Sequence, residues 1–434
     1  MRRFLYNDAG FERDFTAFLE ERRGSAPDVD TAVAAVLAAV KAEGLEAVLR
    51  YTAQFDKVEL TEQTIRVTAD EIAAGAAQCD PAAREAIALA AARIRAYHTR
   101  QHPADQSWTD DLGVELGWRW TALESVGIYV PGGRAAYPST VLMNAVPAQV
   151  AGVDRIAMVT PPGRLEPAVL AAAQEAGVTE IWRIGGAQAA AALAYGAGPI
   201  LPVDKIVGPG NAYVTAAKRR LYGVVGIDAL AGPSEIVVVA DAQNEAAWIA
   251  ADLLSQAEHD PAAQSILITD DPDFAAAIEQ QVQVQLQSLS TGEDAAASWR
   301  DHGAVVIAPL PASPGLVDRI APEHVEFACA DGQALSDKVR HAGAIFLGRF
   351  TPEAIGDYVA GSNHVLPTSR AARFSSGLSI YDFLKRTSIV RCDEAAFARL
   401  GPATVALATV EGLPAHARSA ALRLPQPKTP SGDG

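Results

Sequence analysis

The spacing of hydrophobic positions changes along the chain. Between residues 10 and 105 the apolar side chains recur every three or four positions, most clearly in Asp28–Tyr51 and Pro81–Gln101. From about Trp118 they gather instead in short β-branched runs separated by helical stretches. This alternation predicts an N-terminal helical region followed by α/β structure with parallel sheets. His98 and His102, at the end of the second long helix, are expected on the surface.

The β-branched runs fall into two groups. The first comprises 126–130, 155–160, 180–184 and 205–207, and the second 234–240, 265–269, 304–308 and 343–347. We therefore predict two doubly wound, Rossmann-like parallel-sheet domains. The expected boundaries are a helical region at 1–115 that packs with an α/β domain at 232–375, a further α/β domain at 116–231, and a small C-terminal arm at 376–434 with a frayed end.

Composition narrows the class of protein. The 434 residues are 49% hydrophobic, which is typical of a globular protein, and the formal net charge of −16 argues against a nucleic-acid surface. No apolar run approaches the roughly 18 residues of a membrane helix, and the N-terminus lacks the apolar core of a secretory signal. The odd number of cysteines, three, favours reduced thiols in the cytoplasm.

Three glycine-containing loops follow predicted strands of the first group, at residues 129–140, 185–188 and 208–211. A helix that begins after such a loop presents backbone N–H groups to a phosphate. Three loops at the carboxyl edge of one parallel sheet are typical of a nucleotide crevice. Neither a G-x-G-x-x-G nor a P-loop signature is present, so each loop alone could be only a turn.

Gln256 and His259 are three residues apart in a predicted helix, which places both on one face. An amide oxygen and an imidazole form half of a nitrogen/oxygen metal site, with Asp357, His364 and His416 as downstream candidates for the rest. Zn²⁺ suits such ligands. The alternative is a solvated histidine at a helix end.

Glu323 and His324 stand side by side in a segment that we interpret as helical, where adjacent side chains diverge. A glutamate that activates water beside a histidine that removes another proton is a plausible acid/base pair, and an ordinary surface pair is the alternative. Ser234, just before a predicted strand, could cap, bind substrate or do neither. Cys329 is interpreted as a packed residue.

Seven blocks of the chain resemble histidinol dehydrogenase, the family that catalyses the last two oxidations of histidine biosynthesis. The resemblance extends from about residue 30 to about 424. The blocks are Val-Gly-Ile-Tyr-Val-Pro-Gly-Gly (126–133), Val-Gly-Pro-Gly-Asn-Ala-Tyr-Val (207–214), Ala-Gly-Pro-Ser-Glu-Ile (231–236), Leu-Leu-Ser-Gln-Ala-Glu-His-Asp (253–260), Ala-Pro-Glu-His (321–324), Gly-Asp-Tyr-Val-Ala-Gly-Ser-Asn-His-Val-Leu-Pro (356–367) and Glu-Gly-Leu-x-Ala-His (411–416).

The resemblance implies a role for each matching residue. It implies a zinc ion held by Gln256, His259, Asp357 and His416, and Glu323 and His324 as the catalytic pair. It further implies NAD contacts from Tyr129, Gln188 and Asn211, and substrate contacts from Ser234, His324, His364, Glu411 and the metal ligands. The family is a homodimer whose C-terminal arm completes the partner's site, so Glu411 and His416 are expected to act on the neighbouring subunit.

The reaction implied is the NAD-linked, four-electron oxidation of L-histidinol to L-histidine through L-histidinal. His324 removes a proton in both oxidations and Glu323 activates water between them. A related dehydrogenase for another small polar alcohol, such as a sulfonated diol, is one alternative. A zinc hydrolase, a binding protein with a structural zinc, and a covalent mechanism through Cys329 are others.

Overall fold

The computed structural model describes residues 1–21, 27–132 and 137–425. It contains two compact units: the first comprises Met1–Gln101 and Leu123–Phe383, and the second His102–Ala122 and Leu384–Gly434. Gly133 of the first glycine loop and all but the first residue of the expected frayed end, 425–434, lie outside the described residues. Among the helices of the described part, none has both the length and the apolar composition needed to cross a bilayer.

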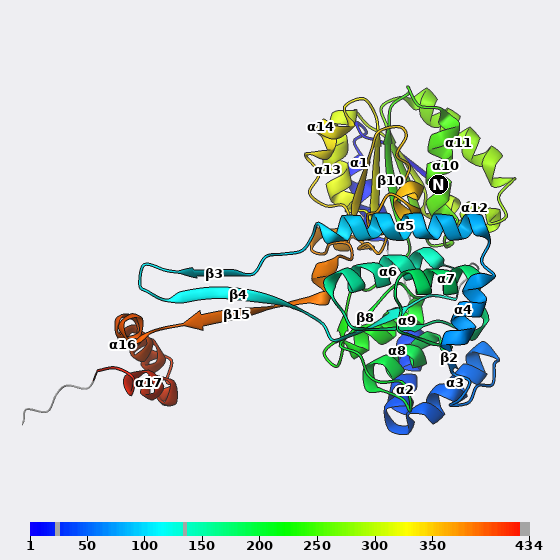
Figure 1. The fold of residues 1–434 in the computed structure, drawn as a ribbon. Coiled ribbons are helices and arrows are strands. Elements are labelled where there is room, and N and C mark those ends of the chain that lie inside the picture. Colours follow the sequence, from blue (N-terminus) through cyan, green and yellow to red (C-terminus); the bar gives the residue numbers. More distant parts are fainter. Residues whose placement is uncertain (22–26, 133–136, 426–434) are drawn as a thin grey trace, which may run out of the picture. The chain divides into compact units, whose positions relative to one another are not determined.

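One six-stranded sheet of the first unit, the β5 sheet, has the strand order β2-β7-β6-β5-β8-β9 (Figure 1). Its strands are β2 (Arg66–Val67), β5 (Ser125–Tyr129), β6 (Arg155–Val159), β7 (Glu180–Trp182), β8 (Lys205–Val207) and β9 (Gly226–Ile227). All neighbours are parallel except β2 and β7. The chain order reverses between β5 and β8, so a ligand crevice is expected at the carboxyl ends of these two strands.

The other six-stranded sheet, the β10 sheet, has the order β1-β12-β11-β10-β13-β14 and is parallel throughout. Its strands are β1 (Arg2–Leu5), β10 (Glu235–Ala240), β11 (Gln264–Thr269), β12 (Ala304–Ile307), β13 (His324–Ala328) and β14 (Ala344–Leu347). Here the order reverses between β10 and β13. The expectation of two doubly wound parallel sheets is therefore confirmed.

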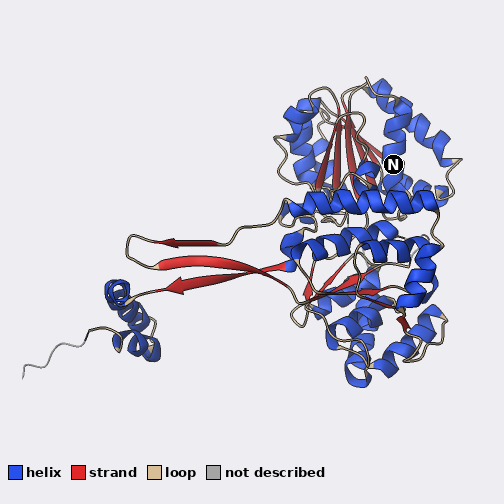
Figure 2. Ribbon diagram, in the orientation of Figure 1, coloured by secondary structure: helices blue, strands red, loops and turns tan. Residues whose placement is uncertain are grey.

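Helices cover both faces of each sheet (Figure 2). Those of the first unit are α1 (Phe11–Glu20), α2 (Pro27–Glu43), α3 (Leu45–Asp56), α4 (Ala69–Ala77), α5 (Pro81–Thr99), α6 (Pro138–Ala151), α7 (Pro167–Glu175), α8 (Gly186–Tyr195), α9 (Ala212–Leu221), α10 (Ala246–Ala257), α11 (Pro272–Leu286), α12 (Gly292–His302), α13 (Ser313–Ile320), α14 (Gly332–Ser336) and α15 (Glu353–Tyr358). In β10, Val237 and Val239 enter one core and Ile236 and Val238 the other. Burial on both faces explains why this strand is an unbroken β-branched run.

The N-terminal region is divided between the two sheets. Phe4, Phe11 and Phe15 belong to a core of the β10 sheet, whereas α2 and α3 supply apolar residues to the core of the β5 sheet. The region thus differs from a purely helical segment that packs with 232–375 alone. The predicted boundaries remain predictions, since the compact units of the structure are drawn differently.

Helix α5 lies across the first unit between the two sheets (Figure 1). It contacts α6 and α7, and Arg93 donates hydrogen bonds to the carbonyl oxygens of Val359 and Ala360 at 2.6 and 2.9 Å. His98 near its end is fully buried, so the expectation of a surface histidine was wrong. Its Nδ1 lies 2.9 Å from the Gln101 amide oxygen, and burial lowers its pKa.

The second unit is a three-stranded antiparallel sheet followed by two helices. Its elements are β3 (Gln106–Thr109), β4 (Glu115–Ala122), β15 (Leu384–Arg391), α16 (Glu394–Val410) and α17 (Pro414–Ala421). Among its helical residues, Leu407 and Val410 remain largely exposed. A small interior with exposed apolar side chains is what the sequence led us to expect of the arm.

Candidate active site

Glu323 and His324 lie at the amino end of β13, not in a helix. The helical interpretation was wrong because Val325 and Phe327 alternate with Glu326 and Ala328 and are all buried, which is the pattern of a central strand. Pairing with β10 places His324 opposite Ile236. The catalytic candidates therefore begin a strand at the point where β10 also begins.

Both side chains are held by the peptide groups of Glu235, the first residue of β10. Glu323 Oε2 accepts the backbone N–H of Glu235 at 3.0 Å, and His324 Nδ1 lies 3.0 Å from its carbonyl oxygen. Because a carbonyl only accepts, Nδ1 carries the proton and Nε2 of a neutral ring keeps its lone pair. Nε2 is buried without a hydrogen-bond partner in the described part of the chain.

Carboxylates surround the free nitrogen of His324. Nε2 lies 3.7 Å from Asp357 Oδ1 and 3.8 Å from Glu353 Oε1. Burial lowers the pKa of His324, but the attraction of Glu323, Asp357 and Glu353 outweighs it and raises that pKa to about 10. Burial raises the pKa of Glu323 to about 7. The pKa of Glu323 thus lies near neutral pH, whereas the pKa of His324 depends on the charges around it.

Helix α10 brings Gln256 to the same region. The Gln256 side chain is buried, and its Oε1 has no hydrogen-bond partner among the described residues. His259 lies two residues beyond the last helical residue, Ala257, so the expectation of one shared helix face does not hold. Its backbone N–H still donates to the carbonyl of Gln256 at 3.3 Å, which keeps the two residues together.

His364 joins this group electrostatically. Burial lowers its pKa, and the charges of Asp357, His324 and His259 also act on it. Burial opposes ionisation of Asp357, yet His324 and His364 hold its pKa down to about 2, so the carboxylate is charged. Four of the predicted side chains, His259, His324, Asp357 and His364, thus lie within electrostatic reach of one another.

The predicted nucleotide residues lie at the carboxyl edge of the β5 sheet. Tyr129 ends β5, and its hydroxyl oxygen accepts the N–H of Gly186 at 2.9 Å. Gln188, in the first turn of α8, is 1% exposed and both its amide atoms lack partners in the described residues. Asn211 caps α9 by accepting the N–H groups of Tyr213 and Val214 at 3.1 and 3.2 Å. Two helix amino ends therefore meet at the switch point.

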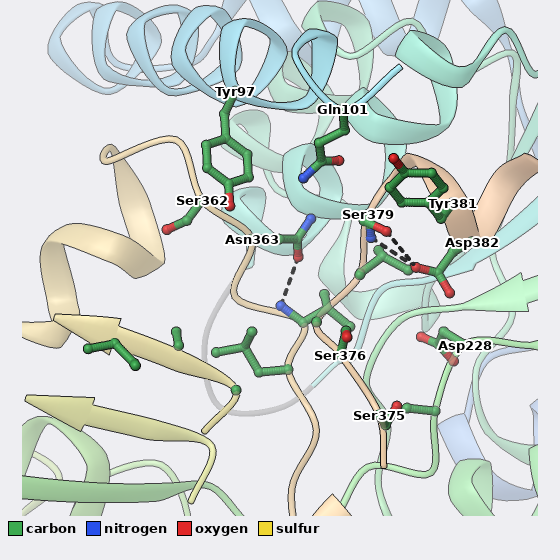
Figure 3. Close-up of a pocket in the computed structure, with 18 of the residues that line it drawn as sticks. Tyr97, Gln101, Asp228, Ser362, Asn363, Ser375, Ser376, Ser379, Tyr381 and Asp382 are labelled. Atoms are coloured by element: carbon green, nitrogen blue, oxygen red, sulfur yellow. Dashed lines mark hydrogen bonds between the residues drawn. The ribbon is translucent and has the colours of Figure 1, made fainter. Parts of the chain in front are cut away.

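A cavity of about 670 Å³ is lined by the sequence neighbours of His364, Asn363 and Val365, and Figure 3 shows Asn363 in its wall. Its wall includes Ser362, Asn363, Val365 and Leu366, residues 375–379, the start of β14, Tyr97 of α5 and Gln101 just beyond that helix. Asn363 Oδ1 accepts the N–H of Val365 at 2.8 Å and its amide donates to the Met143 carbonyl at 2.7 Å. These bonds fix the loop that carries His364.

Comparison with known proteins identifies the family. The model of the histidinol dehydrogenase family matches residues 19–424. Histidinol dehydrogenase of Caulobacter vibrioides is 79% identical over 98% of this chain and 99% of its own, and that of Mesorhizobium japonicum is 60% identical over 96% and 98%. The crystal structure of histidinol dehydrogenase from Elizabethkingia anophelis superimposes with a TM-score of 0.92 at 36% identity, covering 98% of both chains. The chain belongs to the histidinol dehydrogenase family.

Histidinol dehydrogenases are zinc- and NAD-dependent oxidoreductases of histidine biosynthesis, and the donor atoms here suit both groups. The unpartnered oxygen of Gln256, the imidazoles and the Asp357 carboxylate are ligands that zinc accepts. The described residues also contain a compact donor group, His324, Glu353 and Asp357, whose ligand atoms lie within 4.8 Å of one another. It shares only Asp357 with the predicted ligand set, which remains a prediction.

Glu411 and His416 belong to the second compact unit of the chain. Glu411 follows the last residue of α16 and His416 lies in the first turn of α17, and both are exposed. Ser234 directly precedes β10, and its carbonyl accepts the N–H of Gln264 at 2.9 Å. The roles of these three residues remain predictions.

Glu353 and Glu235 are site residues that the sequence analysis missed. Glu353 is buried, accepts a hydrogen bond from Ser255 Oγ at 3.1 Å, and donates its own N–H to Glu326. Burial and the nearby Asp357 charge raise its pKa to about 8. Since Glu353 opens a helix, where acidic residues are common, its sequence position carries no special signal.

Cys329 lies at the opposite end of β13 from the catalytic pair. Cys329 is five positions after His324, which is roughly 16 Å at the usual rise of a strand. Its thiol is buried, and burial raises its pKa to about 11. The interpretation as a packed residue is confirmed, and distance disfavours the covalent alternative.

Proposed function

We propose that this chain oxidises L-histidinol to L-histidine in two steps, with His324 as the base and Glu323 as the group that activates water. The orientation of His324 carries the proposal: Nδ1 faces the Glu235 carbonyl and leaves Nε2 free in a buried site. Gln256, His259, Asp357 and a partner's His416 would hold zinc, and Tyr129, Gln188 and Asn211 would contact NAD.

In the first oxidation, His324 Nε2 takes the hydroxyl proton while the carbinol carbon loses a hydride. Glu323 then accepts a proton from water as the aldehyde is hydrated, and His324 accepts the hydrate's proton in the second oxidation. When bound, zinc would hold the substrate and offset the carboxylates that raise the pKa of His324, and the nicotinamide would accept each hydride. Ser234, His364 and the partner's Glu411 would orient the substrate.

The active assembly that we propose is a homodimer in the cytoplasm. Glu411 and His416 are exposed in a unit whose helices also expose Leu407 and Val410, which favours contact with another chain. A homodimer in which each arm serves the partner's site would bury that surface. The free thiols of Cys79, Cys329 and Cys392 are typical of a reducing compartment.

The decisive experiment measures NADH formed per L-histidinol consumed, before chelation, after chelation, and after Zn²⁺ is restored. Two NADH per substrate, lost on chelation and regained with Zn²⁺, support the proposal. One NADH per substrate would mean that the second oxidation does not occur, which would contradict the role proposed for Glu323. No NADH from a folded, zinc-loaded sample would overturn the choice of substrate and point to another alcohol.

A further inference from the structure

Several polar atoms at the carboxyl edge of the β5 sheet are buried without partners. Within the described residues they include both amide atoms of Gln188, Trp182 Nε1 and Thr160 Oγ1, and Asp56 Oδ2 at the end of α3 is likewise buried without a partner. Buried polar groups normally find partners, so a cluster of orphaned ones indicates that a polar ligand completes them. Gln188 is already assigned to NAD contact, whereas Asp56 has no assigned role.

Asp56 is the last residue of α3, a helix that contacts α8 and shares its core. Its charge acts on the Tyr129 hydroxyl and contributes, after burial, to raising the Tyr129 pKa to about 12. The Asp56 carboxyl group therefore lies near the tyrosine that closes β5, at the edge where Gly186 begins α8. Asp56 belongs by position to the nucleotide crevice.

The fold itself gains nothing from a carboxylate at this place. A negative charge at a helix carboxyl end opposes the helix dipole, and burial raises the pKa of Asp56 without a compensating cation in the described residues. Such an unfavourable group is more consistent with ligand binding than with stability. The neighbouring Phe55 ring is 53% exposed and stacks on Tyr51 at 5.5 Å, which offers a purine an apolar face beside the carboxylate.

We propose that Asp56 accepts hydrogen bonds from the adenosine ribose hydroxyls of NAD and thereby excludes NADP. A carboxylate binds a vicinal diol through two O–H···O bonds and repels a 2′-phosphate by its charge. This inference rests on the proposed function for the presence of NAD, but it assigns the specificity of the crevice to a residue outside the three expected cofactor contacts.

The test measures direct binding of NADH and NADPH to the zinc-loaded, full-length protein, with the fluorescence of the nucleotide as the signal. Asp56→Asn should weaken NADH binding by about 10- to 100-fold, the range for loss of a charge-assisted hydrogen bond, and leave NADPH binding unchanged or tighter. The matched control is Glu59→Gln, which removes an exposed negative charge three residues away and should change neither. Asp56→Ser is the second variant if Asp56→Asn does not fold, as judged by circular dichroism.

Unchanged NADH binding in a folded Asp56 variant would overturn the inference. Equal weakening of NADH and NADPH would also overturn it, because a contact away from the 2′ position affects both alike. The proposed function fails separately, if the unaltered protein binds NADH but forms none from L-histidinol. In that case the change in NADH and NADPH binding still decides the role of Asp56.

Discussion

His324 Nδ1 lies 3.0 Å from the backbone carbonyl oxygen of Glu235, and the N–H of that same residue donates to Glu323 Oε2. The backbone of one residue at the start of β10 thus orients two adjacent side chains at the amino end of β13. Because a strand pair supplies the anchor, the two groups keep separate hydrogen bonds and separate directions. Their chemical roles should therefore be separable by mutation.

Replacing His324 by alanine should lower both oxidations, since its Nε2 takes a proton in each. We expect a loss of about 10²- to 10⁴-fold in kcat with histidinol and with histidinal, the usual contribution of a general base. Glu323→Gln should lower histidinal oxidation more than histidinol oxidation, because only the aldehyde step needs water. Steady-state and single-turnover rates with each substrate measure the difference. Equal losses for both variants in both steps would contradict this division of labour.

Much of the fold was predictable because the decisive segments are locally consistent. Ile236–Val239 is β-branched throughout and can only be a strand buried on both faces, and the glycine loops mark the ends of β5, β7 and β8. Strand β13 was not predictable from the sequence. The segment Pro322-Glu-His-Val-Glu carries polar residues, and they are buried only because β10 and β14 flank them.

The site residues that lie in recognisable sequence motifs were predictable. Those whose role depends on burial by distant segments were not. His98 was misjudged because its environment comes from Asn363, 265 residues away, whose amide lies 3.4 Å from its ring. Glu353 reads as an ordinary helix start, and its proximity to His324 depends on the packing of α15 on β13. Long-range burial of this kind leaves no periodic signal in the sequence.

Mixed dimers should recover activity from two inactive parents. If His416 acts on the partner's site, a heterodimer of His324→Ala and His416→Ala chains has one site with both residues intact. Equal co-expression with different tags should then give about a quarter of normal activity, since half of random dimers are mixed and each mixed dimer has one working site of two. Isolation of the doubly tagged species would double that value. No activity in verified heterodimers would mean that His416 serves its own chain.

Zinc removal should abolish turnover without unfolding the two sheet domains. Their cores are extended apolar clusters formed by strands and helices, so the metal contributes little to their folding. Circular dichroism after chelation should be unchanged while activity returns only with added Zn²⁺. Gln256→Ala and His259→Ala should each reduce bound zinc, measured by mass spectrometry, at least about tenfold. Loss of the folded spectrum on chelation would instead indicate a structural metal.

Asp252→Asn should stabilise the protein near neutral pH and not in acid. Burial raises the pKa of Asp252 to about 6, above the roughly 3.9 of an unfolded chain. The folded state therefore binds the proton more tightly, and this contribution to stability is complete below about pH 4 and is lost as pH rises through 6. Asparagine carries no charge, so the free energy of unfolding of the variant relative to the parent should rise across that window by about 3 kcal/mol.

Urea unfolding of the zinc-saturated protein at several pH values between 4 and 7.5 measures this effect. The matched control is Asp154→Asn, which removes an exposed carboxylate between α6 and β6 and should leave the pH dependence unchanged. Because Asp252 also raises the pKa of the buried Glu326, part of the gain should appear as easier ionisation of that neighbour. If the free energy of unfolding of the variant equals that of the parent at every pH, Asp252 is solvated in the folded state. A variant less stable at pH 7 would show that the charged carboxylate has a favourable partner there.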